Sequence, residues 1–168
     1  DQCFDGLNLS DPALVAEVHH EYIDAGVNII QTNTFGANRY KLARHGLDKK
    51  VTEINQAATE LARRVVMASF KDVMIAGDVG PLGVRLAPFG RVPPEQAHEA
   101  FQEQIQALVN GGVDLLIIET MSDLFEINEA VHAARTVSPT IPIVASMTFT
   151  RDDLTLLGDK PQKVARYL

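Results

Sequence analysis

Residues 11–34 read DPALVAEVHHEYIDAGVNIIQTNT and change their hydrophobic period halfway along. The first part carries an apolar stripe at helical spacing, formed by Leu14, Val15, Val18, Tyr22 and Ile23. This spacing predicts a helix over residues 11–25 that stops at Gly26. Residues 27–32 are then a short β-branched run, typical of a strand buried on both faces.

The same alternation of helix and strand continues along the chain. Further helices are expected over residues 50–70, 94–110 and 123–136, and the start of another over 160–168. Short apolar strands are expected over residues 73–76, 113–118 and 141–146. This order predicts an α/β fold of parallel strands with crossover helices, either a doubly wound sheet or a (β/α) barrel.

Composition and charge narrow the classes of function. The chain has 168 residues and a net charge of −7, and its Lys and Arg residues are scattered, which speaks against nucleic acid as the main partner. No apolar run approaches the roughly 20 residues of a membrane-spanning helix, so no membrane partner is expected. The single cysteine, Cys3, excludes an internal disulfide and a self-contained cysteine-rich zinc site, and it suits a cytoplasmic protein.

All four expected strands end in polar or turn-forming residues. These endings are QTNT at 31–34, GDVGP at 77–81, ET at 119–120 and SMTFT at 146–150. In both candidate architectures, ligands bind where the carboxyl ends of parallel strands meet. Four such endings in succession favour a ligand site over turn chemistry alone.

Three of these residues stand out, each with a structural alternative. Glu119 directly follows the apolar LLII run, so its carboxylate needs a cation, either a substrate ammonium or a neighbouring Lys or Arg. Asn33 offers a donor and an acceptor to a small ligand, or to the backbone of its own loop. Asp78, between Gly77 and Val79, is either functional or turn material.

Other motifs give little support to alternative chemistry. The spacing of Gly77, Gly80 and Gly83 is not the dinucleotide fingerprint. Ser146 lacks the setting of a nucleophile elbow. Four of the five histidines lie in expected helices, and His45 precedes Gly46, where a histidine suits the end of a helix. We therefore expect all five to be surface or capping residues and not metal ligands.

Four segments together resemble a known family in order and spacing. They are LNLSDPALVAEVHHEYIDAGVNIIQTNTFGANRYKL, AGDVGPLG, GGVDLLIIETMSDLFE and PIVASMTFT. The chain resembles the homocysteine S-methyltransferase domain, found in cobalamin-dependent methionine synthase and in bifunctional homocysteine methyltransferase/methylenetetrahydrofolate reductases. The resemblance covers almost the whole of residues 1–168, and the TNTFGAN form leans towards the folate-linked branches.

The resemblance implies a (β/α)8 TIM barrel that makes methionine by methyl transfer to the sulfur of L-homocysteine. It implies a catalytic Zn²⁺ that binds this sulfur as a thiolate, which keeps a nucleophile available at neutral pH. The methyl donor would be methyltetrahydrofolate or methylcobalamin, S-methylmethionine or betaine, with cobalamin or folate bound by other domains.

The resemblance also assigns residues. Glu119 matches the strand-end glutamate that receives the amino group of homocysteine, and Asn33 matches a position close to the sulfur and the zinc. Thr32, Thr34, Asp78 and Ser146 match positions that line the same mouth. We therefore expect Asn33 to be catalytic and the other five residues to bind substrate.

Two parts of the family pattern are absent from residues 1–168. The opening strand with its D-G-A-M-G-T-like motif is missing, and so are the zinc cysteines of the G-x-N-C and G-G-C-C segments. We therefore expect about four of eight βα units, no metal ligand in this segment, and a longer polypeptide around it. The alternatives are a non-catalytic truncated barrel that serves assembly, and another small-molecule (β/α) barrel enzyme.

Overall fold

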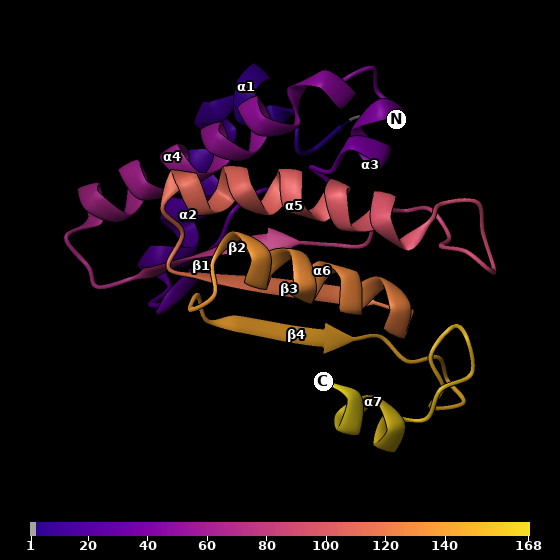
Figure 1. Ribbon diagram of the computed structural model, residues 1–168. Coiled ribbons are helices and arrows are strands. Elements are labelled where there is room, and N and C mark those ends of the chain that lie inside the picture. The colour runs from indigo at the N-terminus through magenta and orange to yellow at the C-terminus, as the bar shows by residue number, and fades with distance from the viewer. Residues whose placement is uncertain (1–2) are drawn as a thin grey trace.

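The computed structural model describes residues 3–168 and shows a parallel sheet with helices packed on one face (Figure 1). The helices are α1 (Leu7–Ser10), α2 (Pro12–Asp24), α3 (Arg39–Ala43), η1 (Asp48–Lys50, a 3₁₀ turn), α4 (Val51–Ser69), α5 (Pro94–Gly111), α6 (Leu124–Val137) and α7 (Pro161–Tyr167). The strands are β1 (Ile29–Gln31), β2 (Met74–Val79), β3 (Leu115–Met121) and β4 (Ile143–Met147). Strand and helix alternate as predicted.

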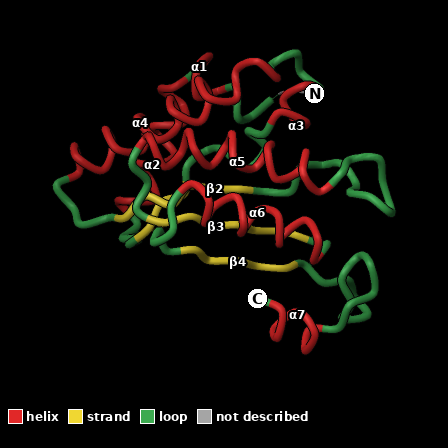
Figure 2. The backbone as a smooth tube through the Cα atoms, viewed as in Figure 1, coloured by secondary structure: helices red, strands yellow, loops and turns green. Residues whose placement is uncertain are grey.

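The strands lie in the order β1-β2-β3-β4, and each pairs in parallel with the next. The parallel direction follows from the connections, since helices between the strands return the chain to the same end of the sheet. Figure 2 shows the strands side by side with the long helices above them. The predicted crossover arrangement is confirmed.

The core lies between the sheet and the helices α4, α5 and α6. Helix α5 packs against both α4 and α6. Its buried stripe includes Phe101, Ile105 and Leu108, which meet the helix-facing side chains Leu116 and Ile118 of β3. Burial of this apolar surface is the main stabilising contribution of the fold.

Within residues 3–168, no such helix layer covers the opposite face of the sheet. Side chains alternate between the two faces of a strand, and Ile29, Met74 and Val144 on this face are 40%, 46% and 50% exposed. The predicted stripe of α2 is also half uncovered. Leu14, Val18 and Tyr22 are exposed beside β1 and line a groove of about 600 Å³, whereas Val15 and Ile23 are buried.

Several predicted boundaries are wrong. Strand β2 continues to Val79 and β3 to Met121, so Asp78 and Glu119 lie inside strands and not after them. The sequence pattern also did not predict α1, α3 or η1, because these helices have at most five residues and no full period of apolar spacing. Helix α2 is capped by Asp11, whose side chain accepts a hydrogen bond from the Leu14 amide.

Within residues 3–168, no helix combines the length and the apolar character needed to cross a bilayer.

The packing of α5 gives a direct test of where stability resides. Replacing Phe101, which is fully buried, by Ala should lower the free energy of unfolding by about 3–5 kcal/mol, because the cavity cannot fully collapse. Phe70→Ala is a matched control, since Phe70 is 97% exposed, and it should change the value by less than about 0.5 kcal/mol. Urea unfolding measures both. Equal effects of the two variants would contradict this placement of the core.

Candidate functional site

The carboxyl ends of the four strands meet at one edge of the sheet, where the arrowheads point in Figure 1. Gln31 is paired with Ala76, and Asp78 with Ile117. Because side chains two residues apart share a face, Gln31, Asp78 and Glu119 all lie on the face without the helix layer. Ser146 lies on that face of β4 and is exposed. Three of the predicted site residues, Asp78, Glu119 and Ser146, are thus brought together.

Glu119 is partly buried and is held by β1. The side-chain amide of Gln31 donates a hydrogen bond of 3.0 Å to Glu119 Oε1, and the Thr120 hydroxyl lies 3.4 Å from Oε2. Thr120 has a left-handed φ of 59°, at the point where the pairing of β3 with β4 shifts register. Such a bulge re-aims the side chains beside it. In the part of the chain that the structure describes, no Lys or Arg forms an ion pair with Glu119.

Asp78 is 7% exposed, and its Oδ1 has no hydrogen-bond partner among residues 3–168. Burial raises the pKa of this carboxyl to about 8, helped by the negative charge of the neighbouring Glu119. Asp5 raises the pKa further, and the Lys41 ammonium opposes the shift. Asp78 therefore keeps its proton at neutral pH.

Thr32 and Thr34 form a closed ring of hydrogen bonds with the backbone of Asp78. The Asp78 amide donates to Thr32 Oγ1 (3.0 Å), and Thr34 Oγ1 donates to the Asp78 carbonyl (2.7 Å). The two hydroxyls lie 2.6 Å apart, so Thr32 must donate to Thr34. Both side chains are buried, at 2% and 0% exposure, and this geometry fixes Asp78 without presenting either hydroxyl to a ligand.

Asn33 holds the segment before α1 against the end of β1. Its Nδ2 donates to the carbonyl of Phe4 (2.8 Å), and Asn8 Nδ2 donates back to the carbonyl of Asn33 (2.7 Å). The side chain of Asn33 thus bonds the backbone of another loop, whereas the alternative to a ligand role had been a bond to the backbone of its own loop. Asn33 itself is partly buried.

A basic hollow of about 270 Å³ lies next to Asn33. Its lining includes Asp5, Lys41, Arg44 and His45. Burial lowers the pKa of Lys41, whose ammonium lies 4.1 Å above the Phe35 ring. Asp5 Oδ1 accepts a hydrogen bond of 2.8 Å from the Gly36 amide, and a Cβ on Gly36 would come within 2.6 Å of this carboxylate. A side chain at position 36 would therefore displace the Asp5 carboxylate from this amide.

Several polar side chains that the sequence pattern did not predict as site residues support this edge of the sheet. Gln104 of α5 donates to the carbonyl of Thr34 (2.7 Å) and is fully buried. Glu126 of α6 accepts from the Leu82 amide (2.7 Å), and burial raises its pKa to about 7. Gln104 could have been found, because it interrupts the apolar stripe of α5 between Phe101 and Leu108.

The side chains described here do not fit a zinc site. No group of three His, Cys, Asp or Glu residues within 3–168 is arranged to hold a metal ion, and Cys3 is the only cysteine. The histidine prediction fails in one case. His19 is 6% exposed, because it lies on the inner side of α2 with Val15 and Ile23. Its Nε2 has no hydrogen-bond partner among the described residues. Burial, together with His20, lowers its pKa.

Comparison with known proteins agrees with the geometry. A sequence model of the homocysteine S-methyltransferase family matches residues 2–168. The chain belongs to the homocysteine S-methyltransferase family. Among curated relatives, the methionine synthases of Mycobacterium leprae (strain TN) and Mycobacterium tuberculosis (strain ATCC 25618 / H37Rv) are 28% identical over 165 residues. These alignments cover 94% of the chain but 14% of each relative.

Solved structures of this family identify the architecture. The metallated form of the homocysteine methyltransferase MmuM from Escherichia coli matches with a TM-score of 0.84 and 25% identity. Its oxidized form matches with a TM-score of 0.83 and 25% identity. Both alignments cover 96% of the chain and 60% of MmuM. The four-stranded sheet is thus part of a (β/α)8 barrel, as expected.

The protonated Asp78 makes stability depend on pH. The folded-state pKa of about 8 exceeds the ordinary value of 3.8, so between pH 4 and 8 the native state retains a proton that the unfolded chain releases. The free energy of unfolding therefore decreases as pH rises through this window. Asp78→Asn should remove this part of the slope. The difference in free energy of unfolding between the variant and the parent should therefore shift in favour of the variant by about 2 kcal/mol or more from pH 4 to pH 8.

Urea unfolding at a series of pH values checks this prediction. Asp72→Asn is the matched control, because Asp72 is exposed and precedes the opposite end of β2. A smaller slope should persist in Asp78→Asn, because the raised pKa of Glu126 acts in the same direction up to about pH 7. If Asp78→Asn and Asp72→Asn gave the same pH dependence, Asp78 would be ionised in the folded protein.

Proposed function

We propose that this protein transfers a methyl group to the sulfur of L-homocysteine to give methionine, and that the edge of β1–β4 binds the amino-acid end of the substrate. The observation that carries the proposal is Glu119. It lies at the carboxyl end of β3 on the face without helices, and within the described residues it pairs with no cation. A substrate ammonium supplies the missing charge.

The first step is binding of the substrate ammonium. A carboxylate accepts about four hydrogen bonds, and Glu119 takes one from Gln31 and a long contact from Thr120. Gln31 fixes the direction of the carboxylate, so its remaining lone pairs receive the N–H groups of the substrate. A fixed amino end also orients the thiol, which makes the later methyl transfer effectively intramolecular.

The other predicted residues take different roles in this proposal. Thr32 and Thr34 position Asp78 through its backbone and do not touch the substrate. Asn33, whose Nδ2 is engaged with Phe4, lies beside the sulfur, and its Oδ1 accepts a hydrogen bond from the thiol S–H before the thiol is deprotonated. Ser146, exposed on β4, supplies a hydroxyl at the far side of the same face.

Zinc enters the proposal only as a group held by residues other than those described, because the side chains here do not fit it. Among the candidate methyl donors, methyltetrahydrofolate or methylcobalamin is favoured over S-methylmethionine and betaine, since the curated relatives are methionine synthases. A cytoplasmic location belongs to the same proposal and rests on the single cysteine.

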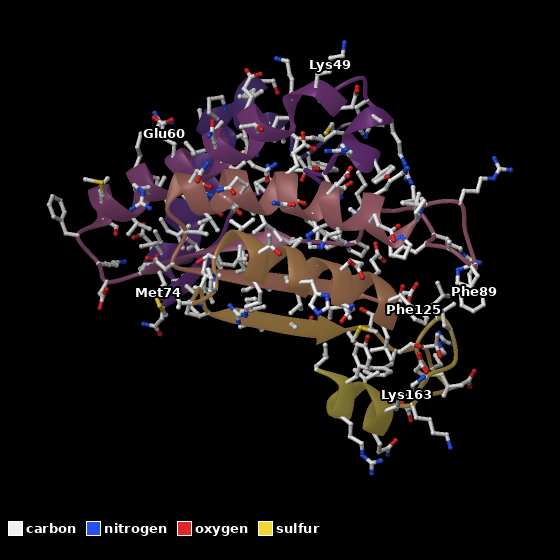
Figure 3. All side chains as sticks on the ribbon, viewed as in Figure 1. Lys49, Glu60, Met74, Phe89, Phe125 and Lys163 are labelled. Atoms are coloured by element: carbon white, nitrogen blue, oxygen red, sulfur yellow. The ribbon has the colours of Figure 1, made fainter. Side chains whose placement is uncertain are left out.

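The role of Glu119 is tested by Glu119→Gln, which keeps the shape and removes the charge. The Kd for L-homocysteine should rise at least about tenfold, because the ammonium loses a partly desolvated counter-ion. Titration calorimetry on the purified protein measures it. The control is Glu60→Gln, an exposed glutamate on α4 far from this edge (Figure 3). An unchanged Kd in Glu119→Gln would refute the proposed ammonium site.

A further inference from the structure

Asp78 is a buried group that the proposed reaction does not yet use. A buried polar atom without a partner costs about 1–3 kcal/mol, so native proteins rarely retain one without a reason. Asp78 Oδ1 is such an atom: the residue is more than nine-tenths buried, and this oxygen has no hydrogen-bond partner among the described residues. Turn chemistry does not explain it, since Asp78 lies inside β2.

The position of this carboxyl is fixed by its neighbours and not by its own hydrogen bonds. The ring through Thr32 and Thr34 holds both the amide and the carbonyl of Asp78. Gln104 approaches the same carbonyl at 3.5 Å. The side chain therefore stays beside Glu119 on the face of the sheet without helices, although its Oδ1 has no partner among residues 3–168.

The groups that face Asp78 show what would satisfy it. Glu119 and Asp5 bring negative charge to this carboxyl, and the Lys41 ammonium opposes them. Glu119 is itself occupied by the neutral amide of Gln31. A cation with several N–H donors, placed between the two carboxyl groups, would satisfy both Glu119 and Asp78.

We propose that Asp78 is the second carboxyl group of the ammonium site, and that it gives up its proton when the substrate's amino group binds. This inference rests on the proposed function, since it assigns a further residue to the same site. The substrate enters as R–NH₃⁺ and Asp78 as the neutral acid. Asp78 becomes a carboxylate that accepts an N–H of the ammonium, its proton passes to solvent, and no bond of the substrate changes.

The pair of carboxyl groups also sets the class of substrate. A primary ammonium has three N–H donors, enough for Glu119 and Asp78 together. The acylated nitrogen of an N-acyl amino acid carries no charge and has one N–H. It can pair with only one of the two carboxyl groups, and it supplies no positive charge for Glu119. The site should therefore reject amino acids whose α-amino group is blocked, since a buried polar group left unpaired gives strong discrimination.

Proton release measures this step directly. L-Homocysteine is titrated into the purified protein at pH 7 in buffers of different ionisation enthalpy, which gives the number of protons released on binding. The parent protein should release about one proton more than Asp78→Asn, because the proton of Asp78 is absent from the variant. Asp72→Asn should match the parent. N-acetyl-L-homocysteine should bind the parent at least about 100-fold more weakly than L-homocysteine, and Asp78→Asn should reduce this ratio about tenfold.

The outcomes separate this inference from the proposed function. Equal proton release in the parent and in Asp78→Asn overturns the role of Asp78, while weaker binding by Glu119→Gln keeps the proposed function. Absence of homocysteine binding to the parent overturns both. If Asp78→Asn does not fold, L-methionine replaces the ligand, because it has no thiol proton. Release of about one proton by the parent then supports the inference, and zero release overturns it.

Discussion

The candidate site depends on the hydrogen-bond ring that joins the end of β1 to the backbone of Asp78. Two threonine hydroxyls, 2.6 Å apart, connect the amide and the carbonyl of one residue in the neighbouring strand. Because both hydroxyls are buried, losing either would leave unpaired polar groups in a low-dielectric interior. The ring thereby fixes a carboxyl group whose own oxygen has no partner among residues 3–168.

The division of the sheet into two faces explains why this carboxyl can serve a ligand. Helices α4, α5 and α6 cover one face and bury the core, so the strands are held rigidly from that side. The other face keeps polar groups only at its carboxyl edge, where Gln31, Asp78 and Glu119 converge. Exposed aromatic side chains, Phe89 and Phe125, lie beyond this edge (Figure 3). A rigid scaffold with polar groups at one edge suits precise substrate placement.

The sequence predicted the fold better than the site. Alternating periods predicted the parallel sheet, since each strand was a continuous apolar run. Strand ends were misplaced at Asp78 and Glu119, because residues that favour turns lie inside strands when neighbouring backbone satisfies them. Thr32 and Thr34 were expected to bind substrate, but their hydroxyls are buried and bond the backbone of Asp78. A sequence does not reveal whether a hydroxyl faces solvent or a neighbouring strand. Gln31 was missed for the same reason, because its partner Glu119 lies 88 residues away. The partner of Gln104 is equally distant in sequence, at 70 residues, and the only sequence signal for Gln104 is its place in the apolar stripe of α5.

A crystal structure of the protein with L-homocysteine tests the central claim most directly, because it locates the amino nitrogen. The account predicts this nitrogen within hydrogen-bond distance, about 2.7–3.2 Å, of carboxylate oxygens of both Glu119 and Asp78. It also predicts that the thiol points towards Asn33. An amino group bound elsewhere, with Asp78 Oδ1 still lacking a partner, would contradict the account.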